Sequence, residues 1–408
     1  MPLRCLTWSR RNTPLALRES LHIEEAAICG VLRALRAEIP LEECALLCTC
    51  HRTELYFVPP SSEAPPDETL APRAAALLGQ LAGAATAAEN ATLLRGDAAV
   101  RHLFRVAAGL ESVALGESQI LGQVKTAYRL ACEAGCNGFY TNACFHRAFR
   151  AGKRVRAQTR LGTTGISAAD VAVAHADHAL GGLAGKRVLV AGGGEIADLL
   201  LRALAGRHPA RVSVARRSPG RACAVPGTAM IHEVPLDAIG RAAGEHDVLF
   251  SATASPGHIL TPAMLDSLPA GHALVVYDLA LPRDVDPAVA ALPGITLHHL
   301  DALADGAPNH LAEEDIRAAE AMVDRAVEDY RTWRKELAAV PSIRRLIAVS
   351  ESVRRAELEK IAATLSDPER ERMERVTRRM AQRILKAIAD ELKRIARDAP
   401  EAGTPPRA

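Results

Sequence analysis

Cys50 lies where a short apolar strand is expected to end, and His51 and Arg52 follow it directly. Positive charge beside a cysteine lowers the pKa of the thiol, and the thiolate is the form that attacks carbonyl carbons. Cys50 is therefore a candidate nucleophile. The alternative is structural, because most free cysteines pack as small hydrophobic residues and the chain has nine cysteines.

A glycine-rich turn follows the β-branched stretch 186–191, and a helical pattern over residues 196–204 follows the turn. The turn has the form G-x-G-x-x-A. Between a strand and a helix, such a turn offers free backbone N–H groups and a helix N-terminus to the pyrophosphate of a dinucleotide. Outside that context a glycine triplet is only a turn. The predicted cofactor-binding residues here are Gly192, Gly193, Gly194, Glu195, Ile196 and Ala197.

The next predicted strand ends in Arg216, Arg217 and Ser218. An acidic residue at this position favours NAD, whereas arginine suits the 2′-phosphate of NADP. The sequence therefore predicts NADPH as the cofactor, and a solvent-exposed basic turn is the alternative. The small residues 251–255 follow a further predicted strand, where the nicotinamide half of the cofactor is expected to approach.

The length of 408 residues predicts two or three domains. With 49% hydrophobic and 24% charged residues, the composition excludes a disordered chain. There is neither a secretory pattern nor an apolar run of about 18 residues, so we expect a cytoplasmic protein with reduced thiols. The net charge of +2 means that any nucleic-acid binding must come from local basic patches.

A second group of thiols invites a metal-site interpretation. Cys132, Cys136, Cys144 and His146 lie close in sequence, but their spacing fits no usual zinc pattern. We expect these residues to pack near a helix end, and no metal is predicted.

Three regions follow one another along the chain. Residues 1–155 mix strand-like runs with helices, and the loop 109–116 between two predicted helices can direct polar groups toward a substrate. Residues 156–305 contain the dinucleotide pattern. Residues 306–408 are helical, and apolar residues recur every three or four positions over residues 343–395. A second subunit is expected to cover these two amphipathic helices.

The last helix has its own start signal. Ser366 and Glu369 have the spacing of a capping box. Six arginines between residues 370 and 383 could contact nucleic-acid phosphates. Glutamates interleave with these arginines, as on an ordinary solvated helix face.

Two longer stretches resemble a known family. Residues 48–56, Cys-Thr-Cys-His-Arg-Thr-Glu-Leu-Tyr, resemble the T-C-N-R-T-E signature of the glutamyl-tRNA reductase family. Residues 109–125, G-L-E-S-V-A-L-G-E-S-Q-I-L-G-Q-V-K, are similar to that family's G-L-D-S-x-V-L-G-E-x-Q-I-L-G-Q-V-K. The resemblance continues through residues 278–286 and the region of Trp333, and fades after about residue 345.

The resemblance implies a multidomain α/β protein. It implies an N-terminal α+β catalytic domain that binds glutamyl-tRNA, a Rossmann-type NADP-binding domain, a long connecting helix and a C-terminal helical dimerisation domain. The implied activity is NADPH-dependent reduction of glutamyl-tRNA to glutamate-1-semialdehyde, the first step of C5-pathway tetrapyrrole (porphyrin) biosynthesis. A homodimer is implied, with glutamate-1-semialdehyde aminomutase as a further candidate partner.

The resemblance also assigns roles to residues. Cys50 would attack the ester carbonyl, and the resulting thioester would accept hydride more readily than the ester. Arg52 would hold the substrate's carboxylate. The implied substrate-binding residues are Thr49, His51, Arg52, Ser112, Glu117, Ser118, Gln119 and Gln123.

Some positions depart from the family pattern. His51 replaces an asparagine, Ser118 replaces a proline, and Leu94 aligns with a histidine that assists at the carbonyl. His51 is the candidate to take over the role of that histidine, although adjacent residues on a strand, such as His51 and Cys50, face opposite ways. Two alternatives therefore stay open. One is a paralogue of the same fold that binds tRNA, NADP or a partner with little reductase activity. The other is a small-molecule NADP oxidoreductase resembling shikimate dehydrogenase, which needs no thiol nucleophile.

Overall fold

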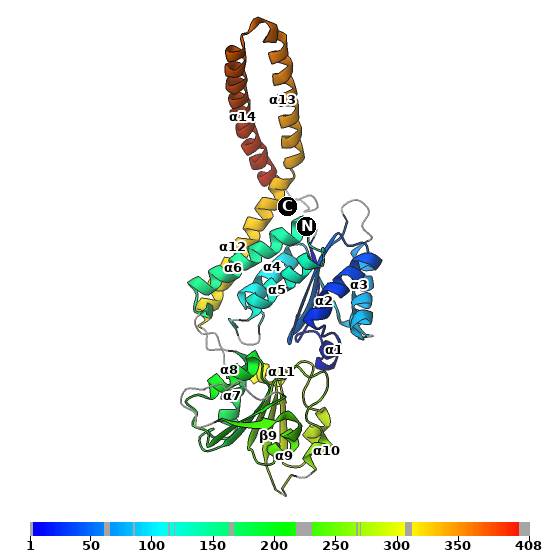
Figure 1. Ribbon diagram of the computed structural model, residues 1–408, viewed down its shortest axis with the longest axis vertical. Coiled ribbons are helices and arrows are strands. Elements are labelled where there is room, and N and C mark those ends of the chain that lie inside the picture. Colours follow the sequence, from blue (N-terminus) through cyan, green and yellow to red (C-terminus); the bar gives the residue numbers. More distant parts are fainter. Residues whose placement is uncertain are drawn as a thin grey trace, which may run out of the picture. The chain divides into compact units, whose positions relative to one another are not determined.

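The computed structural model contains two compact units, Met1–Asp324 and Arg325–Ala408, and Figure 1 labels many of their elements. The residues that it describes are 3–60, 66–84, 86–112, 115–117, 119–162, 167–217, 231–266, 268–269, 271–306 and 312–399.

An antiparallel sheet forms the centre of the N-terminal part, with strand order β2-β3-β1-β4. Its strands are β1 (Arg4–Ser9), β2 (Glu43–Thr49), β3 (Arg52–Val58) and β4 (Thr92–Arg95). β2 and β3 form a hairpin in which Thr49 pairs with Arg52. Cys50 and His51 are consequently the two residues of the hairpin turn.

Helices cover both faces of this sheet, with α4–α6 on one side and α2 and α3 on the other in Figure 1. On one face, Trp8 is fully buried and its indole Nε1 donates to the carbonyl of Ala87 at 2.7 Å. On the other face, Tyr56 packs edge-on against Phe145 of α6. The helices are α1 (Leu15–Ser20), α2 (Glu25–Glu38), α3 (Asp67–Ala82), α4 (Asp97–Ala108), α5 (Ile120–Glu133) and α6 (Phe139–Gln158). Covering on both sides explains why β3 is buried along its whole length.

A parallel six-stranded sheet follows, with the order β10-β9-β8-β5-β6-β7. Its strands are β5 (Arg187–Ala191), β6 (Arg211–Arg216), β7 (His232–Pro235), β8 (Val248–Ser251), β9 (Leu274–Asp278) and β10 (Ile295–His299). In chain order this is 3-2-1-4-5-6 read from β7, the arrangement of dinucleotide-binding Rossmann folds. The order of the strands reverses between β5 and β8, and ligands of such sheets bind beyond the carboxyl ends of the strands at that point.

Short apolar helices pack on this sheet, and two clusters of buried residues, one on each face, form its core. The helices are α7 (Ala168–Ala179), α8 (Glu195–Leu204), α9 (Ile239–Ala243), α10 (Pro262–Leu265) and α11 (Leu300–Gly306). The multidomain α/β prediction is thus confirmed.

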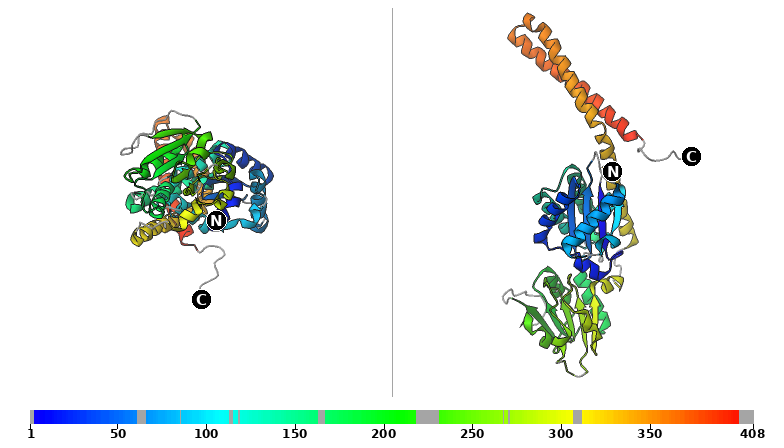
Figure 2. Two further views of the ribbon diagram at one scale, coloured as in Figure 1. Left: turned by 90° about the horizontal axis from the view of Figure 1, so that it is seen from below. Right: turned by 90° about the vertical axis from the view of Figure 1, so that its right-hand side faces the viewer.

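α12 (Glu313–Leu337) crosses residue 324, where the first unit ends. The second unit contains α13 (Val340–Ile361) and α14 (Asp367–Asp398), which form the helical hairpin seen in Figure 2. The predicted cap of α14 is present, since Glu369 accepts from the backbone N–H of Ser366 at 2.9 Å. No helix among the described residues is long and apolar enough to cross a membrane.

Candidate functional site

The β2–β3 turn presents Cys50 and His51 in different directions. Thr49 stabilises the turn, because its Oγ1 accepts from the backbone N–H groups of His51 and Arg52 at 3.2 Å each. Cys50 lines one cavity and His51 lines another. The expectation that these neighbours face opposite ways is right, but the cause is the turn and not alternation along a strand.

Cys50 shares its cavity with the dinucleotide turn. The cavity has a volume of about 560 Å³ and brings the thiol together with the glycine turn, the end of β6 and the loops after β8 and β9. Its lining residues include Cys50, Gly192, Gly193, Gly194, Glu195, Ile196, Arg216, Arg217, Ala252, Thr253, Ala254, Ser255, Leu279, Ala280 and Leu281. The structure therefore places the predicted nucleophile beside the predicted cofactor-binding residues.

The glycine turn has the geometry that its sequence predicts. Gly192 has a φ of +134°, and a Cβ atom there would lie 2.3 Å from the carbonyl oxygen of Ala252. Gly194 precedes the first residue of α8, so the helix N-terminus points its free N–H groups at the turn. Ala197 does not line the cavity; it is fully buried and packs the helix against the sheet.

Arg216 and Arg217 contribute the positive charge of this cavity at the end of β6. This is the position at which dinucleotide-binding folds recognise the adenosine ribose or its 2′-phosphate. Ser218, the third predicted residue, lies outside the described residues. No described carboxylate lines the cavity near these arginines except Glu195 at the start of α8.

The Cys50 thiol is not activated by its surroundings as the sequence suggested. Burial and the charge of Glu117 raise the pKa of Cys50 to about 12, against the opposing charges of Arg18 and Arg52. Burial also raises the pKa of the Glu117 carboxyl, although the Ser112 side chain hydrogen-bonds to it. The expectation of a lowered thiol pKa was wrong, because desolvation outweighs two nearby guanidinium groups.

Arg52 points into a second cavity, of about 450 Å³, on the other side of the turn. Residues lining this cavity include Ser9, Arg10, Arg11, Asn12, His51, Arg52, Leu94, His102, Glu111 and Ser112. His51 is 6% exposed, and burial, with the charges of Arg52, Arg18 and Arg10, lowers its pKa to about 3. A neutral imidazole therefore faces this cavity near pH 7.

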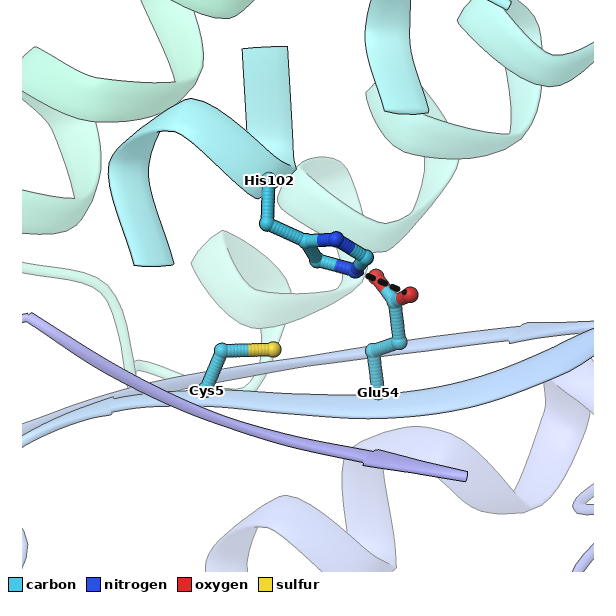
Figure 3. Close-up of side chains that lie close together, drawn as sticks. All are labelled: Cys5, Glu54 and His102. Atoms are coloured by element: carbon cyan, nitrogen blue, oxygen red, sulfur yellow. Dashed lines mark hydrogen bonds and ion pairs between the residues drawn. The ribbon is translucent and has the colours of Figure 1, made fainter. Parts of the chain in front are cut away.

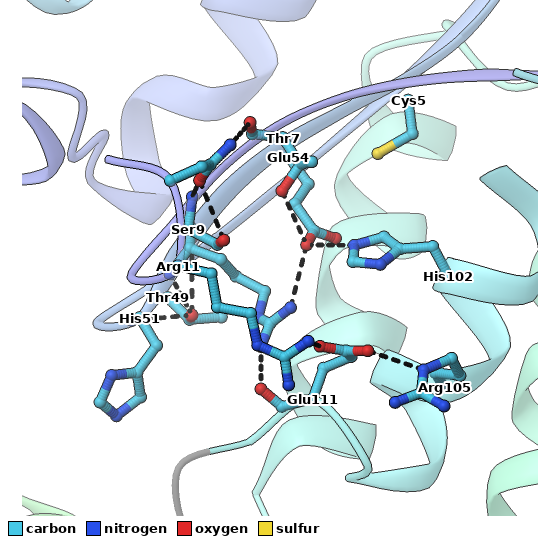
Figure 4. A network of polar contacts seen from close by, with 12 residues as sticks. Cys5, Thr7, Ser9, Arg11, Thr49, His51, Glu54, His102, Arg105 and Glu111 are labelled. Carbon is cyan, nitrogen blue, oxygen red and sulfur yellow. Dashed lines mark hydrogen bonds and ion pairs between the residues drawn. The ribbon is translucent and has the colours of Figure 1, made fainter. Parts of the chain in front are cut away.

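Glu54 and Glu111 belong to a network of polar contacts (Figure 4), and this network holds Arg52. Its Nη1 donates to Glu54 at 3.1 Å, and its Nη2 donates to the backbone carbonyl of Glu111. Glu54 also contacts His102 Nε2 at 2.7 Å and accepts from the Tyr56 hydroxyl at 2.5 Å. Burial would raise the pKa of Glu54, but the charges of His102 and Arg52 hold it well below its usual range. Arg52 is thus fixed before any substrate arrives.

His102 was not singled out from the sequence, yet it lines the same cavity as Leu94 and Arg52. It lies on α4, one turn and a half after the start of the helix, and reaches across to Glu54 on β3. The cavity that Leu94 lines therefore contains two imidazoles, those of His51 and His102. The only local signal was the Arg-His pair within an amphipathic helix, which resembles many solvent-exposed helix faces.

Cys5, Glu54 and His102 form the one group of potential metal ligands found among the described residues, with ligand atoms within 4.8 Å of one another (Figure 3). Glu54 already accepts from Arg52 and Tyr56, and burial and the charge of Glu54 keep the pKa of the Cys5 thiol well above its usual value. A metal would require a thiolate here and would displace these bonds. The cluster is better explained as the buried support of Arg52.

The remaining predicted substrate residues lie elsewhere. Gln119 and Gln123, on α5 and its N-terminus, line a third cavity of about 480 Å³ together with Cys48. Glu195 lines both this cavity and that of Cys50. Glu117 is half-buried; the Ser112 side chain hydrogen-bonds to it, and its charge acts on Cys50. Ser118 lies outside the described residues. Most members of the predicted set are thus divided among three cavities, whereas Thr49 and Glu117 line none of the three.

A parallel sheet of Rossmann order, with a thiol beside its glycine turn, defines a nicotinamide-dependent oxidoreductase with a cysteine at the cofactor cavity. Three family models match the chain. Their descriptions are "Glutamyl-tRNAGlu reductase, N-terminal domain" for residues 6–159, "Shikimate / quinate 5-dehydrogenase" for residues 174–305, and "Glutamyl-tRNAGlu reductase, dimerisation domain" for residues 318–404.

Curated relatives agree with these matches. The glutamyl-tRNA reductase of Rubrobacter xylanophilus is 36% identical and covers 94% of this chain and 90% of its own. That of Desulforudis audaxviator is 34% identical, covering 94% and 86%. A solved glutamyl-tRNA reductase from Methanopyrus kandleri is 27% identical and covers 97% of this chain and 98% of its own, with a TM-score of 0.42.

This chain belongs to the glutamyl-tRNA reductase family. The dehydrogenase match is confined to the nucleotide-binding part, and a reductase match lies on either side of it. The alternative of a small-molecule dehydrogenase therefore fails for the chain as a whole.

Proposed function

We propose that this protein uses NADPH to reduce glutamyl-tRNA to glutamate-1-semialdehyde through a thioester on Cys50, the reaction that opens tetrapyrrole biosynthesis. The observation that carries the proposal is the cavity that Cys50 shares with Gly192–Gly194 and Arg216. A thioester at that sulfur would lie where a bound dinucleotide ends, so acyl transfer and reduction can use one site.

The first step joins the glutamyl carbonyl carbon to Cys50 Sγ. The ester C–O bond breaks, and the tRNA leaves with a free 3′-terminal ribose hydroxyl, which takes up a proton. Because burial raises the pKa of Cys50, the thiol proton must leave as the sulfur attacks. Glu117, which is electrostatically coupled to Cys50, is the proposed acceptor of that proton.

The second step releases the aldehyde from Cys50. When bound, NADPH supplies the hydride for the thioester carbonyl carbon. The C–S bond then breaks, and the Cys50 sulfur leaves as a thiolate that is reprotonated to the thiol. The raised pKa of Cys50 favours this reprotonation and returns the site to its starting state.

The substrate's glutamate is proposed to enter the second cavity. Its free side-chain carboxylate matches Arg52, and Ser112, His51 and His102 supply further polar contacts. Two nitrogens of Arg52 already bond to Glu54 and to Glu111, so the substrate would add to a guanidinium whose orientation is preset. Thr49 supports the turn, and we propose that Gln119 and Gln123 contact the substrate from the third cavity.

The cofactor is proposed to be NADPH and not NADH. Arg216 and Arg217 line the cavity at the end of β6, where the 2′-phosphate would make charge-assisted hydrogen bonds. The proposed domain limits are 1–155 for glutamyl-tRNA binding, 156–305 for NADP and 306–408 for the connecting helix and dimerisation.

The family's dimerisation domain matches residues 318–404, which supports a homodimer. On α13 and α14, apolar side chains lie exposed, among them Val353 at 56%, Met380 at 58% and Ile384 at 57%. Burying such a stripe against a second subunit would remove it from water. The proposed compartment is the cytoplasm, where thiols stay reduced. Glutamate-1-semialdehyde aminomutase is the proposed partner for the reactive aldehyde product.

The decisive experiment measures both the labelling of Cys50 by the substrate and the formation of glutamate-1-semialdehyde. Wild-type protein incubated with ³H-glutamyl-tRNA without NADPH should carry label on Cys50, and adding NADPH should convert it to glutamate-1-semialdehyde. Cys50→Ser should do neither, whereas Cys48→Ser, two residues away on β2, should do both. Label on another cysteine would refute the thioester assignment. Labelling of Cys50 without semialdehyde would instead favour the paralogue of low activity.

A further inference from the structure

Arg18 of α1 lies at a junction between Cys50 and the nucleotide-binding part of the first unit. The side chain is 1% exposed. Its Nε donates to the carbonyl of Thr13 at 3.3 Å, its Nη1 donates to the carbonyl of Cys50 at 3.1 Å, and its Nη2 donates to Asp301. Asp301 is the second residue of α11, which follows the last strand of the parallel sheet. One guanidinium thus joins three separate segments.

The next residue makes a parallel contact. Glu19 accepts from the backbone N–H, Nε and Nη2 of Arg283 at 2.8, 2.7 and 2.6 Å. Arg283 belongs to the loop after β9, whose preceding residues line the Cys50 cavity. Two consecutive residues of α1 therefore hold the nucleotide-binding part by ion pairs, but only Arg18 also bonds to the turn that carries Cys50.

The chemistry of Arg18 makes these contacts dependent on one another. A buried guanidinium is stable only while it is paired and hydrogen-bonded. Asp301 is its one carboxylate partner among the described residues. If α11 moved away, Arg18 would lose that partner and would be expected to reorient toward water, and the Cys50 carbonyl would lose its donor.

We propose that Arg18 is a positioning residue that couples the seating of the nucleotide-binding part to the orientation of the Cys50 turn. The inference rests on the proposed function. Acylation of Cys50 needs only the substrate and the thiol, whereas reduction needs the acyl carbon to face the cofactor cavity. The bridge from Cys50 through Arg18 to Asp301 therefore serves the reduction step.

Asp301→Ala tests the bridge without touching the buried arginine or the turn. Its matched control is Arg283→Ala, which breaks the neighbouring ion pair between the same two parts but leaves Arg18 in place. Three quantities are measured in each full-length protein: the rate of Cys50 acylation without cofactor, the single-turnover rate of reduction after NADPH is added to acyl-enzyme, and the Kd for NADPH from fluorescence titration.

For Asp301→Ala we expect acylation within twofold of wild type, reduction slower by tenfold or more, and an NADPH Kd within twofold, since Arg18 and Asp301 do not line the cofactor cavity. Arg283→Ala should change all three quantities by less than threefold. Equal losses of the reduction rate in the two variants would mean that Arg18 only helps to hold the two parts together and does not position the Cys50 turn. A loss of acylation as large as the loss of reduction, or wild-type reduction in Asp301→Ala, would likewise overturn the coupling.

A second readout does not depend on the reaction. Saturating NADPH should protect Cys50 from iodoacetamide in wild type and in Arg283→Ala, because the thiol lines the cofactor cavity. At equal NADPH occupancy, protection in Asp301→Ala should fall by tenfold, as judged by peptide mapping of Cys50. Unchanged protection would refute the coupling. A wild-type protein that protects Cys50 but forms no acyl-enzyme would refute the proposed function alone.

Discussion

Glu54→Gln is the perturbation that most directly tests the buried network beneath Arg52. Glu54 is fully buried and Arg52 is 5% exposed. The carboxylate accepts from Arg52, His102 and Tyr56. A glutamine keeps the shape, but it removes the charge and turns one acceptor into a donor that faces other donors. Arg52 then has no carboxylate partner among the described residues.

The loss of this partner sets the expected change in the free energy of unfolding. Breaking a buried ion pair by removing one partner costs about 3–5 kcal/mol, because the other charge stays desolvated and unpaired. Tyr56→Phe is the control, since it removes one hydrogen bond to the same carboxylate but leaves the ion pair intact. A hydrogen bond to a charged group contributes about 1.5–3 kcal/mol. Glu54→Gln should therefore lower the free energy of unfolding by more than Tyr56→Phe does.

Trp8 supplies the assay. It is fully buried on β1, and its neighbour Thr7 pairs with Glu54 across the sheet. In a Trp333→Phe background Trp8 is the single tryptophan of the chain, because the sequence has two. Urea unfolding at pH 7.5, followed by its fluorescence, reports on this sheet. A loss below about 1 kcal/mol for Glu54→Gln would refute the reasoning, because it would approach the roughly 0.5 kcal/mol by which ordinary surface substitutions change stability.

The ion pair also predicts the direction in which the stability difference between wild type and Glu54→Gln changes with pH. Despite burial, which opposes it, the pairing with His102 and Arg52 depresses the folded-state pKa of Glu54 below the unfolded value of about 4.3. The stabilisation is present above about pH 4.3 and is lost as the pH falls through the folded pKa. The difference in unfolding free energy between wild type and Glu54→Gln should therefore shrink as the pH falls below about pH 4. A difference that grows with acidification would contradict this assignment.

Further predictions address the cofactor, the thiol and the second cavity. Replacing both Arg216 and Arg217 by Ala should raise the Kd for NADPH by more than tenfold while changing that for NADH by less than threefold, because only NADPH carries the 2′-phosphate; equal changes would place these arginines outside the site. Glu117→Gln should lower the pKa of Cys50, since Glu117 raises it, and so speed iodoacetamide alkylation at pH 8, but should slow acylation by glutamyl-tRNA if Glu117 is the base. Faster acylation would exclude that role. Leu94→His should alter single-turnover reduction by less than threefold because the cavity already holds a histidine of α4, and a gain near a hundredfold would restore the idea of a missing acid.

The nucleotide-binding half was predictable because its determinants are local. A β-branched strand, a glycine turn and a helix follow one another within about 20 residues, and each has its own sequence pattern. Gly192 can be read directly as a residue that needs a positive φ and close backbone approach, and the structure shows both. Likewise, Arg216 and Arg217 lie at the end of the second strand, roughly 20 residues after the glycine turn, where Rossmann units place the residues that recognise the adenosine ribose.

The second cavity was not predictable in the same way, because its residues meet only through the antiparallel sheet. Glu54 on β3 contacts His102 on α4 across 48 positions of the chain. Glu54 belongs to the family signature but nothing in the sequence points to its partner, and a helix histidine such as His102 is ordinarily solvent-exposed. Their burial depends on both faces of the sheet being covered by helices. The family signature contains both Arg52 and Glu54, but it does not indicate that they contact each other or that Glu54 also contacts His102.

The pKa of Cys50 shows how sequence proximity can mislead about chemistry. His51 and Arg52 follow Cys50 in the chain, but the turn directs His51 into another cavity, where burial and neighbouring arginines keep it neutral near pH 7. Arg52 forms a buried ion pair with Glu54, which largely neutralises its charge. What remains at the thiol is desolvation and the charge of Glu117, and together they raise its pKa to about 12. Because the resting sulfur is a thiol and not a thiolate, it is activated only when substrate and a proton acceptor are both in place.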